Sequence, residues 1–436
     1  MSLKRVLIIT YYWPPSGGAG VQRWLKFVKY LPEFAWEPII LTVDPEKASF
    51  PQIDLSLQNE VPVNLKVYKT VTTEIYNLYK KLSPEKKIPF AGFVNENTSG
   101  IFSSVSRFIR GNFFIPDPRK GWNKYAYKKA KEIINDYHIT TVITSSPPHS
   151  TQLIGLKLKQ KLHLKWIADL RDPWTDIYYY KDLLRTKIAK LIDSKYEKKV
   201  LEIADRIIVV SHSIQERFMI KSKKVGADKF TVIPNGFDEK DFLHNSVPSE
   251  KHFIITYTGT LSRVYRIDSL LRVLRKMSGQ SDIHIKLRFI GKVSDYIKSL
   301  IAEKGLNEIV EYIDHVEHAK SIEYLYHSTI LLLVIPEVTE NRGILTGKIF
   351  EYLASQKPIL LIGPTDGDAA TVVKECEAGE VFDYDMETET EYYLNKLIQQ
   401  WLKNPNLDLK TKRHLVYSRK KQAATLARLL LAVSSR

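Results

Sequence analysis

The sequence predicts an α/β protein made of two doubly wound, Rossmann-like domains that follow one another along the chain. Its 436 residues exceed the roughly 150 that one domain usually holds. Short apolar runs of strand length alternate with segments of helical spacing. This alternation stops in a polar stretch at residues 239–251 and starts again at Phe253. Two domains joined near this stretch are therefore expected.

The first unit of the pattern lies at the start of the chain. Residues 5–10 form an apolar run of strand length, and the Pro- and Gly-rich segment 11–20 must be a loop. Residues 21–31 have helical spacing, and residues 37–43 form a second apolar run. Strand, loop, helix and strand in this order indicate a right-handed parallel βαβ unit.

Further units follow in the first half, but residues 71–121 interrupt them. The same reading predicts helices over 122–137 and 150–161, and strands over 141–144, 165–170 and 204–210. In the interruption, aromatic and aliphatic residues are interleaved with Lys and Arg. A lid, an insertion facing a membrane surface and a helical subdomain packed on the core are all compatible with that composition.

The second half repeats the alternation. Strands are expected over 253–257, 284–290, 310–313, 329–335 and 358–363, with helices over 267–277, 295–304 and 321–327, another starting near Lys348, and a last one over 417–431. We therefore predict an N-terminal domain over 1–245, which also includes a final helix at about 417–436, and a C-terminal domain over 252–416. Ligands of such sheets bind at the carboxyl ends of the strands, so one cleft faced by both sheets is expected.

Composition excludes several classes of protein. With 44% hydrophobic and 26% charged residues, the chain has the composition of a soluble globular protein. No run of about 18 apolar residues predicts a membrane-spanning helix, and the N-terminus looks like a first strand rather than a signal peptide, so a cytoplasmic location is expected. The single cysteine, Cys376, excludes an intramolecular disulfide, and the scattered histidines predict no metal site.

Positive charge is concentrated in the first half. Residues 1–210 hold 33 Lys and Arg against 20 Asp and Glu, which accounts for +13 of the net charge of +16. This excess indicates an anionic partner, such as a lipid headgroup surface, a polyprenyl diphosphate or a nucleic acid. A solvated basic face without a specific ligand would give the same count.

Residues 341–360 carry the most informative motif. A glycine loop there runs into a helix with Lys348 and Glu351 one turn apart. Loop amides and a helix N-terminus attract phosphate, a lysine adds a point charge, and a carboxylate can accept hydrogen bonds from a ribose diol. The motif thus predicts a nucleotide-diphosphate site, while an ordinary strand-loop-helix-strand unit is the simpler alternative. The buried side of the helix would comprise Ile349, Phe350, Leu353 and Ala354.

Five segments in order resemble glycosyltransferase family 4, which has the GT-B fold. They are Gly-Gly-Ala-Gly (17–20), Ala-Asp-Arg-Ile-Ile-Val-Val-Ser (204–211), Val-Ile-Pro-Asn-Gly-Phe-Asp (232–238), Tyr-Thr-Gly-Thr-Leu (257–261) and Gly-Lys-Ile-Phe-Glu-Tyr-Leu-Ala (347–354). The resemblance covers nearly the whole chain. It implies a retaining transferase that takes a sugar from a UDP- or GDP-linked donor, usually without a metal or another cofactor.

The resemblance also implies roles for the two domains. In such enzymes the N-terminal domain binds the acceptor, here a glycan or a polyprenyl-diphosphate-linked glycan, and the C-terminal domain binds the nucleotide-sugar. Relatives often build capsule, lipopolysaccharide O-antigen or exopolysaccharide, so peripheral contact with an anionic membrane surface is expected. The last helix typically crosses back onto the N-terminal domain.

Residues of the C-terminal half match the family's donor site one by one. Glu351 resembles the ribose-binding glutamate, and Lys348, preceded by Thr346 and Gly347, lies where related sequences approach the donor phosphates. The first loop of this half would hold the diphosphate through the matching residues Gly259, Thr260 and Arg263, with Arg266 as a second basic candidate.

One position departs from the family pattern. The fuller motif has two glutamates separated by seven residues, and this chain has Gly343 where the first is expected. Glu337 and Glu340 are near in sequence, but neither is in register. The group that orients the transferred sugar is therefore left open, although a related subgroup also lacks this glutamate.

Candidates in the N-terminal half follow a glycine loop and two strands. Gly17, Gly18 and Gly20 would bring backbone amides close to the donor diphosphate or the acceptor. Asp169, Arg171 and Asp172 follow a strand where relatives place a polar residue facing the donor sugar, and His149 could assist the acceptor hydroxyl, so these four are the catalytic candidates. An Asp-Arg pair that fixes the loop, and a histidine that merely neighbours a helix start, are the structural alternatives.

Other functions remain compatible with the sequence. A sugar-nucleotide 2-epimerase shares the two-domain architecture, and the missing glutamate allows a catalytically silent scaffold. The basic first half allows a non-enzymatic protein that binds an anionic polymer, although no nucleic-acid recognition motif is present, so we expect no nucleic-acid partner.

Overall fold

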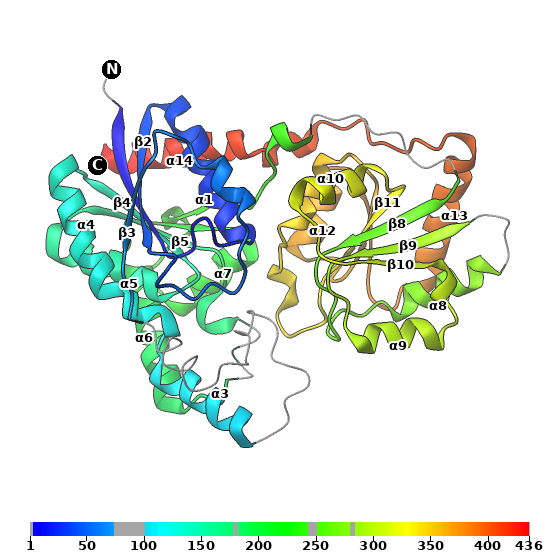
Figure 1. The fold of residues 1–436 in the computed structure, drawn as a ribbon, viewed down its shortest axis with the longest axis horizontal. Helices are drawn as coiled ribbons and strands as arrows, with labels where there is room; N and C mark the ends of the chain where they lie inside the picture. The colour runs from blue at the N-terminus through cyan, green and yellow to red at the C-terminus, as the bar shows by residue number, and fades with distance from the viewer. Residues whose placement is uncertain are drawn as a thin grey trace. The chain divides into compact units, whose positions relative to one another are not determined.

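The computed structural model describes residues 3–73, 101–177, 180, 183–242, 251–279 and 284–435. The chain divides into two compact units, an N-terminal unit of residues 1–234 and 419–436 and a C-terminal unit of residues 235–418. The division follows Pro234 and thus precedes the polar stretch in which the sequence analysis placed it. Each unit is a parallel sheet flanked by helices (Figure 1).

The N-terminal unit is built on seven parallel strands. Their order across the sheet is β3 (Lys66–Thr70), β2 (Trp36–Val43), β1 (Lys4–Thr10), β4 (Thr141–Ser146), β5 (Lys165–Leu170), β6 (Arg206–Val209) and β7 (Phe230–Val232). The chain runs outward from β1 to β3, returns beside β1 as β4, and then runs outward to β7. The carboxyl ends of β1 and β4 therefore flank a topological switch point, the place where doubly wound sheets bind ligands.

Helices cover both faces of this sheet. Alternate residues of a strand point to opposite faces, so Ile8 and Leu7 of β1 belong to different cores. Ile8 packs in the core that includes α1 (Ala19–Tyr30) and α14 (Arg419–Ser434). The opposite face is covered by α4 (Asn123–Tyr137), α5 (Ser150–Leu162), α6 (Lys187–Ile203) and α7 (His212–Lys221).

The last helix, α14, returns to the N-terminal unit and packs beside α1 (Figure 1). Leu426 and Leu430 of α14 are fully buried in one core with Trp24 and Val28 of α1. An ion pair of 2.7 Å between Lys420 and Glu33 joins the start of α14 to the turn after α1. The end of the chain thus completes a core that begins with its first strand and helix.

The C-terminal unit has six parallel strands in the order β10 (Val310–Ile313), β9 (Ile285–Ile290), β8 (Phe253–Thr258), β11 (Ile330–Val334), β12 (Ile359–Ile362) and β13 (Gly379–Phe382). Its switch point lies between β8 and β11. Both units therefore have the doubly wound order that the sequence predicted, in which each sheet grows outward from its first strand.

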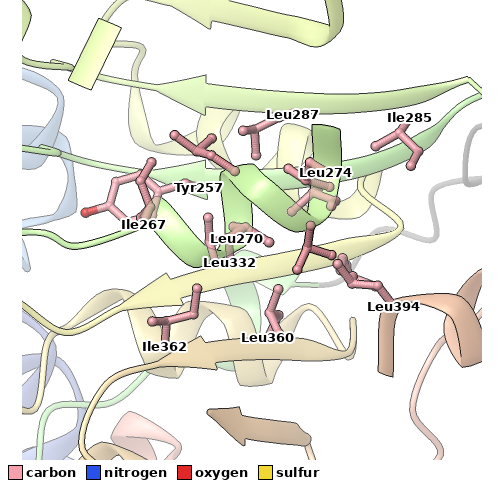
Figure 2. Close-up of a cluster of buried hydrophobic side chains, with 14 of the residues drawn as sticks. Tyr257, Ile267, Leu270, Leu274, Ile285, Leu287, Leu332, Leu360, Ile362 and Leu394 are labelled. Carbon is pink, nitrogen blue, oxygen red and sulfur yellow. The ribbon is translucent and has the colours of Figure 1, made fainter. Parts of the chain in front are cut away.

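Two apolar layers hold the C-terminal sheet. Figure 2 shows Leu270 and Leu274 of α8 (Asp268–Ser278) packing with Leu287, Leu332 and Leu360 of the strands. α9 (Asp295–Glu303) and α13 (Glu387–Lys403) complete this face, and α10 (His318–Tyr326), α11 (Lys348–Ala354) and α12 (Asp368–Glu375) cover the other. The predicted buried side of α11 is confirmed, and Tyr352 is buried with it.

Several elements lack a clear apolar pattern in the sequence. β3, β13, α6, α7, α12 and α13 were not predicted, and α3 (Ile101–Phe113) lies in the segment interpreted as an insertion. Residues 74–100 of that segment lie outside the described residues, so its interpretation as a lid or membrane-facing insertion stays a prediction. Within the described part of the chain, no helix has the length and hydrophobicity needed to cross a membrane.

Candidate functional site

The loop after β8 lies at the switch point of the C-terminal sheet. Gly259 has φ of 100°, in the left-handed region that favours glycine. A Cβ at this position would lie 3.2 Å from Nζ of Lys348. The Gly259 N–H donates to the Ile290 carbonyl over 2.7 Å. Because that amide already has an acceptor, Gly259 serves to admit the Lys348 side chain and does not itself offer the amide that the sequence analysis expected for a diphosphate.

Lys348 begins α11 and reaches back toward β8. Its Nζ lies 3.9 Å from the centroid of the Tyr257 ring. Among the described residues, no hydrogen bond or ion pair joins the ammonium to an acceptor. Burial lowers the pKa of Lys348 to about 7, and the charge of Glu351 opposes this effect only in part. The half-buried Lys348 side chain thus holds an ammonium without a bonded carboxylate beside the end of β8.

Glu351 is held by a partner that the sequence analysis missed. Its Oε1 lies 3.1 Å from Nε2 of His318, at the start of α10. Both side chains keep about a quarter of their surface exposed, so the carboxylate can still be reached from solvent. The next residue, Tyr352, accepts from the Thr258 N–H over 2.9 Å and fastens α11 to the end of β8.

The approach to α11 contains another polar group without a partner. The Thr346 hydroxyl oxygen has almost no exposed surface and no hydrogen-bond partner among the described residues. α11 itself has only seven residues, so it offers a short dipole, and the predicted attraction of phosphate by this helix is correspondingly weak. Side chains around Gly347, such as Lys348, therefore contribute more positive potential there than the helix dipole does.

The two arginines predicted near the diphosphate lie in different surroundings. The Arg263 guanidinium lies over the Tyr296 ring, 4.9 Å from its centroid. Arg266 pairs with Glu337 over 3.2 Å and also with Asp385. Two carboxylates already compensate Arg266, which weakens the case for it as a phosphate ligand. The same ion pair engages Glu337, one of the two glutamates near the missing motif position.

Thr260 and Gly343 complete the predicted set in this unit. The Thr260 carbonyl accepts from the Tyr257 hydroxyl over 2.7 Å, which fixes the loop after β8. Gly343 ends a 3-10 turn, η9 (Asn341–Gly343), whose Asn341 donates to the Pro336 carbonyl and the Tyr384 hydroxyl. Position 343 therefore lies in a well-bonded loop between β11 and α11, and Glu340 precedes it with a left-handed backbone.

A second group of candidates lies at the carboxyl ends of β1, β4 and β5 in the N-terminal unit. A Cβ at Gly20 would collide with the guanidinium of Arg171, so this glycine is required by close packing. Nε of Arg171 donates to the Ser146 carbonyl over 2.9 Å. Among the described residues, its terminal nitrogens have no acceptor.

The neighbouring loop and carboxylate complete this part of the unit. The Gly17 N–H donates to the Gln52 carbonyl over 3.0 Å. Gly18 has φ of 103°, in the left-handed region that favours glycine. Asp172 is half-buried, and burial raises the pKa of its carboxyl against the opposing effect of Arg171. Arg171 and Asp172 are thus the predicted charged groups of this unit that keep unused hydrogen-bonding capacity.

Asp169 is enclosed in the core of the N-terminal unit. Its carboxylate accepts from Arg23 over 3.1 Å, from Trp24 over 3.2 Å and from Ser145 over 2.7 Å. Neither Asp169 nor Arg23 has exposed side-chain surface. The Asp-Arg pair proposed as the structural alternative is therefore present, but with Arg23 of α1 as the partner and not Arg171. A catalytic role for Asp169 stays a prediction that its burial disfavours.

His149 is also buried. Its ring stacks on Trp174 with the centroids 4.8 Å apart, and neither ring nitrogen has a hydrogen-bond partner among the described residues. Burial, followed by the charges of Arg171 and Lys221, lowers the pKa of His149 to about 3. A neutral imidazole with so low a pKa is a weak base, which disfavours the predicted assistance to an acceptor hydroxyl.

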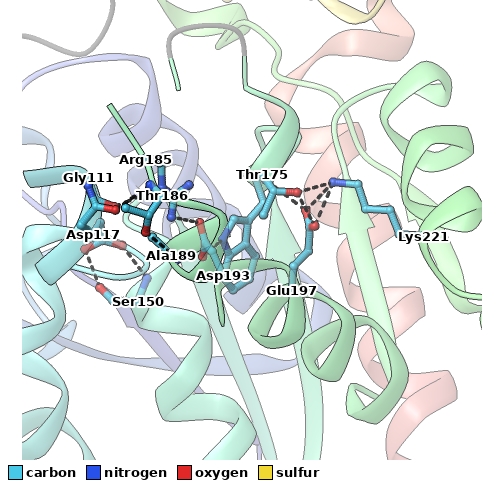
Figure 3. Close-up of polar contacts among 12 residues, drawn as sticks. Gly111, Asp117, Ser150, Thr175, Arg185, Thr186, Ala189, Asp193, Glu197 and Lys221 are labelled. Atoms are coloured by element: carbon cyan, nitrogen blue, oxygen red, sulfur yellow. Dashed lines mark hydrogen bonds and ion pairs between the residues drawn. The ribbon is translucent and has the colours of Figure 1, made fainter. Parts of the chain in front are cut away.

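A polar network missed by the sequence analysis supports the loop after β5. Figure 3 shows Asp193 of α6 bound to Arg185, and Glu197 bound to Thr175 and Lys221. The Trp174 indole N–H also donates to Asp193 over 2.9 Å. Carboxylates four residues apart within the otherwise basic stretch 187–199 were the available signal, since acidic residues facing inward need cationic partners.

A cavity of about 430 Å³ lies elsewhere in the C-terminal unit. Its lining includes Pro358 and Gly379, which lie at the amino ends of β12 and β13, with Lys374 and Tyr393 from the flanking helices. Doubly wound sheets bind ligands at the opposite, carboxyl ends. This cavity is therefore separate from the candidate site around Lys348.

Comparison with known proteins gives two family matches. Residues 239–422 match the model described as "Glycosyl transferases group 1", and residues 93–241 match the model described as "Glycosyltransferase Family 4". Together these matches cover most of the chain without overlapping by more than a few residues. No curated protein matches the sequence closely enough to count as a relative.

Solved structures share the fold at low sequence identity. A sucrose-phosphate synthase from Thermosynechococcus elongatus aligns with 16% identity and a TM-score of 0.62, covering 99% of each chain. HepE from Anabaena in complex with UDP aligns with 13% identity and a TM-score of 0.62, covering 98% of this chain and 100% of that one. A UDP-N-acetylglucosamine 2-epimerase aligns with 11% identity and a TM-score of 0.55, covering 100% and 98%.

Proposed function

The chain belongs to glycosyltransferase family 4 and has the GT-B fold, and from this premise we propose that it transfers a sugar from a UDP- or GDP-linked donor with retention of configuration. The proposed acceptor is a glycan or a polyprenyl-diphosphate-linked glycan of a surface polysaccharide such as capsule, O-antigen or exopolysaccharide. Neighbouring structures named as complexes with UDP or with a UDP-sugar support the choice of donor.

One observation carries the proposal. The half-buried Lys348 ammonium lies beside the switch point of the C-terminal sheet, faces Gly259 and Tyr257, and has no hydrogen-bonded or ion-paired anion among the described residues. A structural lysine in such a place would be expected to have a carboxylate partner, because an unpaired buried charge is unfavourable. A diphosphate from the donor would supply that partner.

The same geometry supports the proposed catalysis of glycosyl transfer. The diphosphate gains negative charge as the bond to the sugar breaks, so a fixed ammonium beside it stabilises the transition state more than the ground state. No reorganisation of the protein is needed at that moment, because Gly259 and Tyr257 already hold Lys348 in place. Glu351, reachable from solvent and oriented by His318, is suited to bind the ribose hydroxyls.

Replacement of Glu351 tests the ribose contact. A nucleotide sugar at about 100 times its dissociation constant should add roughly 2.7 kcal/mol of stability to the wild type. We expect Glu351→Ala to lose most of this stabilisation, measured as the shift in melting temperature with UDP- and GDP-linked sugars. Glu308→Ala, an exposed glutamate of the same unit, is the matched control and should keep the shift. An unchanged shift in the Glu351 variant would exclude this residue from the donor site.

The pKa of Lys348 predicts how donor binding depends on pH. Below a pH of about 7 the free protein already carries the ammonium, whereas above it a proton must be taken up on binding, because the diphosphate stabilises the charged form. Donor affinity should therefore fall as the pH rises above 7, by up to tenfold per unit. Calorimetry in buffers of different ionisation enthalpy would measure the proton uptake directly.

The stability of the free protein depends on pH in the opposite direction. Between a pH of about 7 and the ordinary pKa of lysine the unfolded chain binds the extra proton, so this group makes the free protein more stable as the pH rises. Lys348→Met should abolish both trends. A donor affinity that is constant between pH 6.5 and 8.5 in the wild type would contradict the assignment of Lys348 to the diphosphate.

An epimerase is the competing enzyme, since a UDP-N-acetylglucosamine 2-epimerase occurs among the structural neighbours. Both family matches favour a transferase. Product analysis separates the two: a transferase releases nucleoside diphosphate in the presence of an acceptor, and an epimerase converts the nucleotide sugar without one. In the N-terminal unit, Arg171 and Asp172 are the residues that we assign to the sugar or the acceptor, because both keep free hydrogen-bonding capacity.

A further inference from the structure

The loop before α11 has no side chain at position 343, and a second loop lies directly against it. Residues 363–367 connect β12 to α12, and β12 is the neighbour of β11 in the sheet. A Cβ at Gly367 would lie 3.0 Å from the Arg342 carbonyl oxygen and 3.4 Å from the Arg342 Cα. Because both loops leave the carboxyl ends of adjacent parallel strands, they share the edge of the sheet at which ligands bind.

An ion pair fastens these two loops to each other. Nη2 of Arg342 lies 2.5 Å from Oδ2 of Asp366. The loop after β12 is itself a closed turn, because the Gly367 N–H donates to the Pro364 carbonyl over 3.2 Å. The start of α12 is therefore held against η9, the short turn that ends at Gly343.

Asp368, the first residue of α12, carries a carboxylate without a partner. Its Oδ2 is enclosed by protein atoms, and no hydrogen bond or ion pair joins this carboxylate to another group in the part of the chain that the structure describes. An enclosed carboxylate oxygen usually accepts a hydrogen bond, since leaving it unsatisfied is unfavourable. Asp366 differs, because its side chain is 56% exposed and already paired with Arg342.

The unpaired carboxylate lies close to the position where the family pattern has its first glutamate. Gly343 directly follows Arg342 in the sequence, and Asp368 directly follows Gly367. The contact between Arg342 and Gly367 therefore brings the two positions within one residue of the same point. A carboxylate is thus available beside the gap at position 343, although it comes from α12 and not from the loop before α11.

We propose that Asp368 replaces the missing glutamate and accepts hydrogen bonds from hydroxyl groups of the transferred sugar. An ionised carboxylate has two oxygens and only accepts, which suits a sugar edge with neighbouring hydroxyl donors. This assignment rests on the proposed transferase function and names the group that orients the sugar. It separates the donor site into two parts, because Lys348 and Glu351 would bind the nucleoside diphosphate and Asp368 would bind the sugar alone.

Binding of nucleotides with and without the sugar tests the assignment. The probes are UDP, GDP, UDP-glucose, UDP-galactose and GDP-mannose, measured by calorimetry on the full-length wild type and on Asp368→Asn and Asp368→Ala. Both variants should bind the nucleoside diphosphate within about twofold of the wild type, but bind the nucleotide sugar about 10- to 100-fold more weakly, as loss of a hydrogen bond to a charged group predicts. Turnover, measured as kcat/KM for nucleoside diphosphate release, should fall by at least the same factor.

Two variants are the matched controls. Asp366→Asn removes a carboxylate two positions away that forms an exposed pair with Arg342, and it should weaken sugar binding at most about threefold. Glu387→Gln neutralises an acidic residue in the first turn of α13 in the same unit and should behave like the wild type. If Asp368→Asn lowered only the melting temperature, its charge would merely stabilise the start of α12, and the assignment would be overturned.

Deoxy analogues of the preferred donor identify the contact itself. Removing the hydroxyl that Asp368 accepts from should weaken binding to the wild type about tenfold, and should have no further effect on Asp368→Ala, because the two changes delete the same hydrogen bond. Additive losses at every hydroxyl would overturn the assignment while the transferase proposal stood. A wild type that bound none of the five nucleotides would overturn the proposed function, and this assignment with it.

Discussion

Lys348→Met is expected to lower kcat by about 10² to 10³ while leaving the protein folded. Removing one preorganised group that stabilises developing charge typically has this effect on turnover. Met has nearly the length of the lysine side chain and keeps its packing against Tyr257, so the loss would be one of charge and not of shape. The measurement is steady-state release of nucleoside diphosphate, with the melting temperature recorded for the same sample.

Stability should change in the opposite direction. The ammonium of Lys348 is destabilised by burial, as its lowered pKa shows, so replacing it with an uncharged side chain should leave the melting temperature of the free protein unchanged or raise it. Lys298→Met, at a lysine of the same unit that lies over an aromatic ring, is the matched control and should retain full turnover. A kcat for Lys348→Met within threefold of the wild type would remove Lys348 from the mechanism.

Asp169→Ala should destabilise the N-terminal unit by about 3 to 5 kcal/mol. Arg23 has no exposed surface, and without Asp169 it would stay as an uncompensated charge inside the protein. The donors of Trp24 and Ser145 would lose the same acceptor. Urea unfolding followed by tryptophan fluorescence measures the change, because six of the seven tryptophans lie in the N-terminal unit.

Two comparisons give this prediction its control. Arg23→Met/Asp169→Leu should recover more than half of the lost stability, since an apolar pair can replace a buried ion pair at little cost. Arg5→Met breaks a pair with Glu37 whose side chains are 42% and 26% exposed, and it should cost no more than about 1 kcal/mol. If Asp169→Ala abolished turnover without changing the urea transition, Asp169 would instead take part in catalysis.

The order of the strands could be predicted because parallel βαβ units have few topologies. β1, α1 and β2 have clear apolar patterns, and one right-handed connection rule then places them in the sheet. β3 was missed because this edge strand is only half-buried and its sequence, Lys-Val-Tyr-Lys-Thr, has no apolar run. α6 was missed because its inward residues include Asp193 and Glu197, which hide the helical pattern of apolar residues.

The candidate site shows a similar limit. The spacing of Lys348 and Glu351 on one helix is a local property, and the sequence indicated it. The residues that contact them depend on tertiary packing: His318 lies 33 residues before Glu351, and Tyr257, which contacts Lys348, lies on β8. The sequence also could not separate Asp169 from Arg171, which differ by two positions but point into a closed core and toward Gly20, respectively.

The return of α14 to the first unit has a consequence for synthesis on the ribosome. The 184 residues of the C-terminal unit are translated after β7 and before α14, which takes roughly 10 to 40 s at ordinary elongation rates. During that interval the surface of α1 against which α14 packs lacks its cover. The nascent N-terminal unit must therefore persist with part of its apolar core exposed until α14 is synthesised. Chaperones recognise exposed apolar surface of this kind.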